Sequence, residues 1–236
     1  MARRMRRLFV GVSIVVSMVG CSSGSRPETA HPSGSRPLAS LSVPPFHGVT
    51  AFHDDFRSGA FDARWVAEHA VVQRHGGADP AAWVRLTAAS VPAYLSLRSQ
   101  VFGTGHTQYM FQGRFRVISR APHQSVGLAT IENSAGKNHD DFFIDAATGR
   151  CRVDIYRGDT ASTTTRCDDA RWHRVTMIGD YGSSAYALRW SVDGVSLATV
   201  RSVGQMPAAV QRLWLGDATP AKTNLSDWAD VSITIG

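Results

Sequence analysis

Short segments in which apolar and polar residues alternate recur through most of this sequence. They read AWVRLT at 82–87, AYLSLRS at 93–99, YMFQGRFRVIS at 109–119, CRVDIY at 151–156, WHRVTMIGD at 172–180 and AYALRWSV at 185–192. Alternation with a period of two, bounded by Gly, Asp, Asn or Ser, is typical of half-buried antiparallel strands. Long amphipathic helical stretches with capping residues are absent from the sequence. We therefore expect an all-β domain, and the number of short strands favours a two-sheet antiparallel sandwich.

The clearest local signal within this pattern is the dipeptide Asp193-Gly194, which lies between two alternating segments. Asp-Gly suits the two positive-φ positions of a type I′ turn, the tightest connection between antiparallel strands. The sequence therefore predicts a hairpin in which residues 188–192 pair with residues 195–200.

Residues 1–20 have the features of an export signal. Four arginines lie within residues 1–7, and residues 8–19 are mostly apolar. This stretch of about a dozen residues is shorter than the roughly 20 that a membrane-spanning helix needs. The chain then continues as Met-Val-Gly-Cys, ending at Cys21, which resembles the lipobox of bacterial lipoproteins. The resemblance implies acylation of Cys21, for example by palmitate, and a lipid anchor on the extracytoplasmic face of a bacterial cell membrane. The alternative is an ordinary signal peptide with a chance cysteine.

Residues 21–45 are rich in Ser, Pro and Gly and carry no aromatic residue. Such a segment buries too little apolar surface to offset the entropy lost on ordering, so we expect a flexible linker. Residues 46–236 then form one domain, which is long enough to enclose a substantial core.

The net charge of the exported chain is small. The whole sequence has 25 Lys and Arg against 19 Asp and Glu, a formal charge of +6. Removing the four arginines of residues 1–20 leaves 21 basic against 19 acidic residues, a charge of +2. A nucleic-acid-binding domain would require a basic patch that this composition does not supply, so no nucleic-acid partner is expected.

Two cysteines remain beyond Cys21, at positions 151 and 167. In an exported chain, an even number of remaining cysteines predicts a disulfide, here Cys151–Cys167. In the chain-entropy account this bond stabilises the fold by about 3 kcal/mol. The alternative is a pair of free thiols. Neither CxxC nor HxxxH spacing accompanies them, which argues against a zinc site.

Five segments together resemble a known family of β-sandwiches. They are FHDDFRSGAFDARW at 52–65, RWHRVTMIGDY at 171–181, SVDGVSLATV at 191–200, RLWLGDA at 212–218 and DWADVSITIG at 227–236. In content and order they resemble concanavalin A-like lectin/glucanase domains, also called laminin G-like domains. The resemblance implies a jelly-roll sandwich whose first and last strands lie side by side. Because this fold carries many functions, it indicates no single activity.

Some members of that family hold a structural calcium ion near the terminal strands. The resemblance therefore implies Asp54, Asp55 and Asp230 as candidate ligands of a structural Ca²⁺. Ordinary hydrogen bonding at the strand ends is the alternative, and no other cofactor is implied.

Glycoside hydrolases of the same superfamily carry Glu-x-Asp-x-Glu on one strand, where alternation places the acids on one face. The corresponding segment here is DFFID, with Asp141 and Asp145 at its ends and Phe143 in the middle. At ~3.3 Å per residue the two aspartates lie about 13 Å apart along a strand, beyond the roughly 9.5 Å limit for inverting enzymes. Asp145 also opens DAATG, a sequence typical of a hairpin turn at 146–149. We expect no catalysis, and the enzymatic alternative retains Asp141, Asp145 and Glu132.

A glycan-binding site combines flat aromatic side chains with polar groups that hydrogen-bond to hydroxyls. The polar segment 132–141 and alternating polar residues within 109–119 are suited to this, the latter lining a concave sheet. The candidate binding residues are Gln112, Arg114, Arg116, Glu132, Asn138 and Asp141. Plain solvent-facing positions are the alternative. The six tryptophans fall mostly within strand patterns, and we expect most of them in the core.

Two classes of function remain open. The first is a membrane-anchored module that binds a polysaccharide or another cell-envelope component without catalysis. The second is a divergent polysaccharide hydrolase or lyase, although the Gln-x-His and Tyr-x-Lys patterns of jelly-roll lyases are absent. A purely structural envelope lipoprotein is a further alternative.

Overall fold

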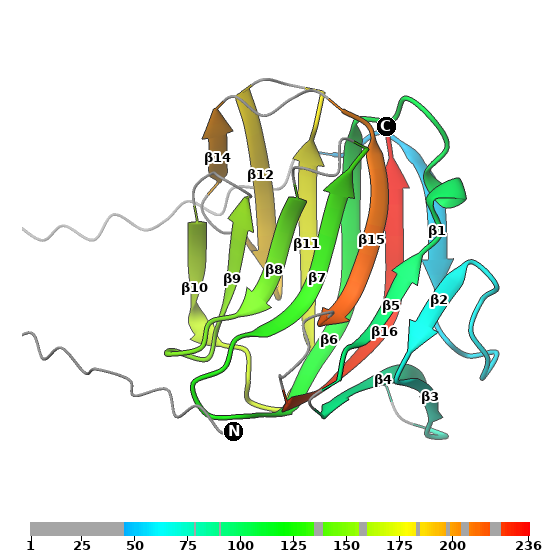
Figure 1. Ribbon diagram of the computed structural model, residues 1–236, viewed down its shortest axis with the longest axis vertical. Coiled ribbons are helices and arrows are strands. Elements are labelled where there is room, and N and C mark those ends of the chain that lie inside the picture. Colours follow the sequence, from blue (N-terminus) through cyan, green and yellow to red (C-terminus); the bar gives the residue numbers. More distant parts are fainter. Residues whose placement is uncertain are drawn as a thin grey trace, which may run out of the picture. The chain divides into compact units, whose positions relative to one another are not determined.

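Two antiparallel β-sheets lie face to face in the computed structural model, and their facing side chains form one hydrophobic core (Figure 1). The structure describes residues 45–77, 79–89, 91–134, 139–155, 160–182, 185–196, 199–203, 208–217 and 223–236. The arrangement confirms the expected all-β, two-sheet sandwich with jelly-roll architecture. Among the described residues, no helix has the length and apolar character needed to cross a membrane.

The larger sheet has nine strands within the described residues. Their order is β13-β12-β11-β6-β16-β4-β3, with β1 paired to β16 and β14 paired to β12. The strands are β1 Val49–Asp54, β3 Ala70–Arg74, β4 Ala82–Ala89, β6 Gln108–Arg120, β11 His173–Asp180, β12 Ala185–Val192, β13 Val195–Ser196, β14 Val200–Val203 and β16 Thr223–Ile235.

The smaller sheet has seven strands in the same part of the chain, in the order β10-β9-β8-β7-β15-β5-β2. They are β2 Trp65–Glu68, β5 Ala93–Leu97, β7 Val126–Asn133, β8 His139–Ile144, β9 Arg150–Ile155, β10 Thr160–Arg166 and β15 Val210–Asp217. A short 3₁₀ helix, η1 Ser99–Phe102, follows β5.

The alternation seen in the sequence separates core from surface along β4, β6, β8 and β9. In β6 every second residue from Tyr109 to Val117 is buried, and the residues between them are partly exposed. Phe115 of β6 meets Phe142 of β8 edge to face, with ring centroids 5.2 Å apart. Because β6 and β8 belong to different sheets, this aromatic contact joins the two layers.

The two ends of the domain lie side by side, as the family resemblance implied. Val49 of β1 pairs with Ile235 of β16, and Asp54 pairs with Val231. The Asp193-Gly194 turn also forms as expected, with φ of 53° and 76° at its two residues. It joins β12 to β13, and β14 continues the pairing along β12.

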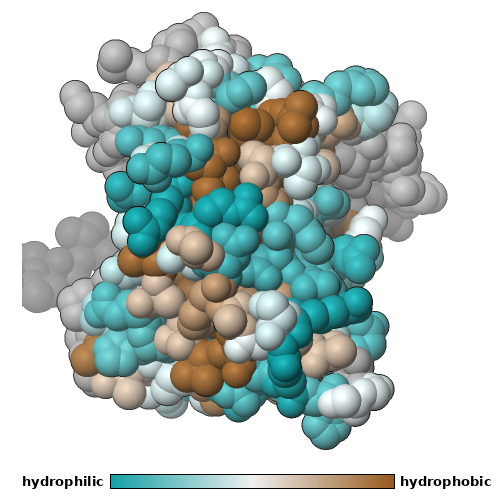
Figure 2. All heavy atoms as spheres, turned by 90° about the vertical axis from the view of Figure 1, so that its right-hand side faces the viewer, coloured by the Kyte–Doolittle hydropathy of each residue, from teal (hydrophilic) through white to brown (hydrophobic). Residues whose placement is uncertain are grey.

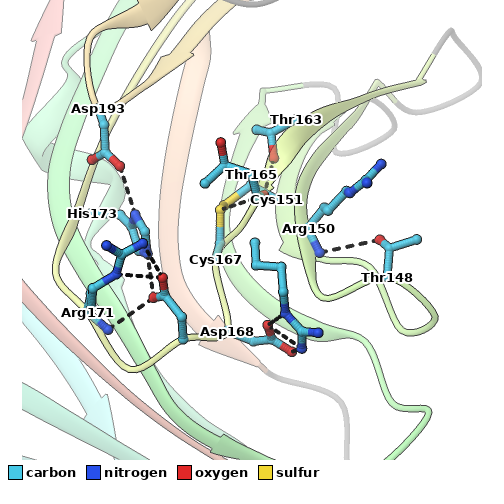
Figure 3. Close-up of a disulfide and its surroundings, with 12 residues drawn as sticks. Thr148, Arg150, Cys151, Thr163, Thr165, Cys167, Asp168, Arg171, His173 and Asp193 are labelled. Atoms are coloured by element: carbon cyan, nitrogen blue, oxygen red, sulfur yellow. Dashed lines mark hydrogen bonds and ion pairs between the residues drawn. A yellow bond between two sulfur atoms is a disulfide. The ribbon is translucent and has the colours of Figure 1, made fainter.

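A disulfide joins Cys151 in β9 to Cys167, which follows β10, as the cysteine count predicted (Figure 3). Both cysteines are fully buried. Six residues further on, the buried ring of His173 lies between two carboxylates, with Nδ1 2.8 Å from Asp193 and Nε2 2.9 Å from Asp169. His173 therefore ties the start of β11 to the turn after β12, which is a structural role.

Hydrophobic side chains on the side of the molecule that carries β1, β2 and β3 form separate patches among hydrophilic ones (Figure 2). Each of these strands carries one exposed valine, Val49, Val66 or Val71, and the large apolar sequence neighbours Trp65 and Val72 are buried or partly buried. Isolated exposed apolar residues are common on protein surfaces and need no partner to explain them.

Candidate functional site

A hollow of about 380 Å³ opens on the outer face of the seven-stranded sheet, over β7, β8 and β15. We call it the sheet cleft. Its chemistry comes from three carboxylates, two aromatic rings and a hydroxyl: Glu132, Asp141, Asp217, Phe143, Trp214 and Thr130.

Strand parity places these side chains in the cleft. In β8, Asp140, Phe142 and Ile144 point into the core, so Asp141 and Phe143 face outward. In β7 the same alternation turns Thr130 and Glu132 outward. In β15, Leu213 and Leu215 are buried, which leaves Trp214 between them on the outer face. Neighbouring strands thus present one continuous polar and aromatic surface.

Both oxygens of Asp141 are held by neighbours. Thr130 Oγ1 of β7 donates to Asp141 Oδ1 at 2.7 Å. His139 Nε2 lies 3.0 Å from Asp141 Oδ2. This hydrogen bond raises the pKa of His139, because the protonated ring is the better donor, while partial burial opposes the rise. The Asp141 carboxylate is therefore fixed in orientation and accompanied by a basic ring.

Glu132 and Trp214 are linked through one arginine. Arg212 NH1 lies 3.4 Å from Glu132 Oε2. The same guanidinium lies over the Trp214 ring, 5.1 Å from its centroid. Tyr94 of β5 packs edge-on against Trp214 with centroids 4.9 Å apart. Trp214 is thus a supported, half-buried platform that extends toward Tyr94.

Asp217 closes one end of the cleft. Its side chain is almost buried, and its Oδ2 accepts a hydrogen bond from the backbone N–H of Gly127 at 3.2 Å. At the other end, Arg152 of β9 lies over the Phe143 ring at 5.4 Å. The cleft therefore runs between two charged ends with aromatic surface between them.

Asp145 belongs to the turn after β8. Its Oδ1 accepts hydrogen bonds from the backbone N–H groups of Ala147 and Thr148 and from the Thr148 hydroxyl, at 3.1, 2.9 and 2.8 Å. The Thr148 backbone bond is the largest of the contacts that lower the pKa of Asp145. The structure thus gives Asp145 the turn role expected from DAATG, and it does not line the sheet cleft.

The other expected binding residues divide between the two faces of the sandwich. Glu132 and Asp141 line the sheet cleft, whereas Gln112, Arg114 and Arg116 lie on β6 in the nine-stranded sheet. The outward side chains of β6 face away from the cleft, so the two groups do not form one site. Asn138 and the expected lipidation residue Cys21 lie outside the described residues.

The three aspartates expected near the terminal strands do not converge on a metal. Asp54 accepts from the Phe56 N–H at 2.7 Å and from Trp65 Nε1 at 2.9 Å. Asp55 accepts from the Arg57 N–H, and Asp230 lies 3.5 Å from the Arg114 guanidinium. Nowhere in the described residues do three or more His, Cys, Asp or Glu gather as metal ligands. These carboxylates do not fit a calcium site.

Trp214, Tyr94 and Asp217 are cleft or cleft-edge residues that the sequence analysis did not single out. The expectation that most tryptophans are buried holds for Trp65, Trp190 and Trp228. The remaining three, Trp83, Trp172 and Trp214, are only partly buried. The signal was present in RLWLGD, since two leucines flanking a tryptophan on a strand must point opposite to it.

Solved structures share this fold at low sequence identity. The cellulose-induced protein Cip1 has a TM-score of 0.56 at 11% identity, over 77% of this chain and 96% of that chain. The endo-1,3-β-glucanase from Streptomyces sioyaensis has a TM-score of 0.53 at 15% identity, over 81% and 98%. The receptor-binding domain of botulinum neurotoxin type G has a TM-score of 0.56 at 8% identity, over 79% and 47%.

These likenesses define the class of fold: concanavalin A-like, lectin/glucanase-type β-sandwiches. The class includes both enzymes and binding domains, so the fold by itself decides neither. Neither a protein-family model nor a curated protein sequence matches this chain.

Proposed function

We propose that this protein is an exported lipoprotein whose sandwich binds a neutral glycan in the sheet cleft without cleaving it. The observation that carries the proposal is the cleft itself, in which the half-buried Trp214 ring lies beside Glu132, Asp141 and Asp217. An aromatic platform flanked by hydrogen-bonding groups is the arrangement that sugar rings require, since their C–H faces stack and their hydroxyls bond at the rim.

The charges of the cleft favour a ligand without acidic groups. Three carboxylates line it. The two arginines beside it, Arg152 and Arg212, are not among its lining residues, and each is paired with a carboxylate of the protein. Ionised carboxylates only accept hydrogen bonds, so the ligand has to supply donors, and sugar hydroxyls do so. A uronate or phosphate group would instead meet charges of its own sign. A neutral polysaccharide is therefore the ligand class proposed for this site.

The fold neighbours support a glycan ligand by analogy. One is named an endo-1,3-β-glucanase and another a cellulose-induced protein. Both names point to neutral glucans, which makes laminarin and soluble cellulose derivatives the first probes to use.

The proposed location rests on the N-terminal sequence. A signal at 1–20, acylation of Cys21 and a linker over 21–45 would hold the domain 46–236 outside the cytoplasmic membrane of a bacterium. There the domain would meet envelope or environmental polysaccharides. Labelling with a radioactive or alkyne-bearing fatty acid tests the anchor, and the expected incorporation disappears in Cys21→Ser.

Affinity electrophoresis tests the glycan site. The purified protein is run through native gels that contain laminarin, hydroxyethylcellulose or no polymer. We expect one neutral polymer to retard the wild type. The Trp214→Ala variant should bind about tenfold more weakly or worse, because it loses the stacking surface.

Trp83→Ala is the matched control, since Trp83 is also half-buried but lies on β4 in the other sheet. It should migrate like the wild type. Equal loss of retardation in both variants would show that the effect is structural. Absence of retardation by every neutral polymer would contradict the glycan proposal and favour a structural envelope role.

One observation favours a hydrolase as the second candidate. Thr130 pairs with Asp141 and Glu132 pairs with His139 across β7 and β8, so Glu132 and Asp141 are diagonal neighbours on one face. Diagonal cross-strand residues have Cα atoms about 7–8 Å apart, so their carboxyl groups can reach the separation of roughly 5–9.5 Å that glycosidases use. The pair that could act is therefore cross-strand rather than Asp141 with Asp145.

A reducing-end assay on the same gel polymers separates the two candidates. A binding module releases no new reducing ends. A hydrolase releases them, and both Glu132→Gln and Asp141→Asn would abolish the release while leaving retardation in place.

A further inference from the structure

A second, smaller hollow lies on the opposite face of the sandwich, over β1, β16, β6 and β11 of the nine-stranded sheet. Its volume is about 210 Å³. We call it the arginine pocket, and its polar lining residues are His53, Gln112, Arg114, Arg174, Asp230 and Ser232.

The two arginines face each other directly. Arg114 of β6 is the cross-strand partner of Arg174 of β11, so both side chains project from the same face. Like charges at directly opposed positions destabilise a pair of strands unless an anion lies between or beside them. The arrangement therefore calls for a counter-ion.

Asp79 supplies that counter-ion from a neighbouring loop. Its Oδ1 lies 2.5 Å from Arg114 NH1, and its backbone oxygen accepts from Arg114 NH2 at 3.4 Å. The hydrogen bond with Arg114 is the main reason that the pKa of Asp79 is lowered, and the positive charge of Arg174 contributes. A carboxylate is thus already bound at the arginine pair, but it belongs to the protein.

This internal carboxylate is easy to displace. The Asp79 side chain is 88% exposed, whereas that of Arg114 is only 16% exposed. Exposed ion pairs are weak because water and salt screen them and because both side chains lose freedom. The second anion near Arg114, Asp230, lies 3.5 Å away and is itself partly exposed.

Arg174 retains donor capacity. Its backbone N–H bonds to Asp193, but among the described residues its exposed guanidinium makes no hydrogen bond or ion pair. A guanidinium presents five N–H donors in a planar fork that matches a carboxylate or phosphate. Gln112 of β6 lines the same pocket, and its Nε2, which donates to Thr176 Oγ1 at 3.3 Å, carries a second N–H.

We propose that the arginine pocket binds the carboxylate or phosphate group of an anionic ligand between Arg114 and Arg174, and that Asp79 competes with this ligand for Arg114. The site is independent of the sheet cleft, which lies on the other sheet and carries the opposite charge. The molecule would then hold a neutral glycan on one face and an anionic ligand on the other.

Isothermal titration calorimetry at low ionic strength tests the pocket, with hexagalacturonate as the carboxylate probe and inorganic phosphate as the phosphate probe. We expect at least one of them to bind the wild type. Asp79→Asn should tighten binding severalfold, because it removes the internal competitor. Arg174→Gln should weaken binding about tenfold, because it removes the guanidinium whose N–H donors are available to the ligand.

Arg189→Gln is the matched control. Arg189 is an exposed arginine on β12, next to β11 in the same sheet, and it does not line the pocket. This variant changes the net charge by the same amount and should bind both probes as the wild type does. Equal weakening by Arg189→Gln and Arg174→Gln would show a general charge effect and overturn the proposal. Failure of both probes to bind wild type and Asp79→Asn would overturn it as well.

Discussion

The buried carboxylate of Asp140 is the most unusual single residue in this protein. It accepts hydrogen bonds from the hydroxyls of Tyr109, at 2.5 Å, and Tyr186. Burial dominates its environment and raises its pKa from 3.8 to about 6, although the tyrosine hydrogen bonds oppose the rise. Its other oxygen, Oδ1, has no partner among the described residues. The folded protein therefore keeps the Asp140 proton up to about pH 6.

This raised pKa makes stability depend on pH in a defined direction. Between about pH 4 and pH 6 the unfolded chain has lost the Asp140 proton while the folded chain keeps it, so the folded state binds more protons. The stabilisation that the Asp140 proton contributes to the folded state is therefore fully present below pH 3.8. It is lost as the pH rises to about 6. The shift corresponds to a change on the order of 2–3 kcal/mol in the free energy of unfolding.

Replacing Asp140 by Asn should flatten this part of the pH profile, because the amide does not titrate. Urea unfolding of the wild type and Asp140→Asn at several pH values between 4 and about 7 measures the difference. Asp154→Asn, a half-exposed carboxylate on β9, is the control and should retain the wild-type slope. Parallel profiles for wild type and Asp140→Asn would contradict the assignment.

Adjacent acids in the sequence have unrelated roles, and only strand parity separates them. Asp140 and Asp141 are neighbours, yet Asp140 shares the inward parity of Phe142 and Ile144 while Asp141 faces the cleft. This parity alone predicts that Asp140 points into the core and that Asp141 points outward. The tyrosine partners of Asp140 could not be predicted in this way, since Tyr109 and Tyr186 come from strands of the opposite sheet.

The hairpin of β8 and β9 shows how one side chain stabilises an element. Asp145 bonds to the backbone and side chain of its own turn and lies 3.6 Å from the Arg152 guanidinium. Asp145→Ala should lower the free energy of unfolding by about 1 kcal/mol, because the turn loses these contacts. Asp145→Asn retains an acceptor oxygen, so its free energy of unfolding should fall by less than that of Asp145→Ala.

The same two variants also test the role of Asp145 in the proposed function. Urea titration measures the stability change, and affinity electrophoresis measures glycan retardation. Retardation should stay at the wild-type level in both, since Asp145 does not line the sheet cleft. Loss of glycan binding in Asp145→Asn, with the free energy of unfolding unchanged, would show that Asp145 belongs to the binding site.

At the level of elements, local patterns predicted the strands well and their positions in the sheets poorly. The segments around 82–87, 109–119 and 173–180 all lie within strands, and the Asp193-Gly194 turn forms. Which sheet a strand joins depends on pairing between distant segments, such as β16 inserted between β6 and β4. For this reason Arg114 and Glu132, grouped together from sequence, belong to opposite faces.

At the scale of the whole molecule, the two outer faces differ in chemistry. The sheet cleft carries carboxylates beside Trp214, while the arginine pocket carries Arg114 and Arg174. Each face belongs to one sheet, so each is held by that sheet's strand pairing and by the shared core. The two proposed sites therefore lie on separate faces, and each of the two variant sets described above should affect one ligand only.

The domain boundary is also a prediction at this scale. Every described strand lies between Val49 and Ile235, and the strands that carry these two residues pair with each other. A fragment of residues 46–236 should therefore fold alone, with a thermal midpoint equal to that of the chain that begins at Cys21. Circular dichroism measures both midpoints. A large drop in the fragment would show that residues 21–45 contribute to the fold.

The central claim, that a neutral glycan binds at the sheet cleft, is tested most directly by indole NMR. Each tryptophan of the ¹⁵N-labelled protein gives its own indole N–H signal, assigned through the Trp214→Ala and Trp83→Ala variants, and laminarihexaose and cellohexaose are titrated in turn. We predict that the Trp214 signal moves in proportion to binding while the Trp83 and Trp172 signals, from the nine-stranded face, stay in place. A glycan that binds and moves Trp83 or Trp172, but not Trp214, would contradict the account.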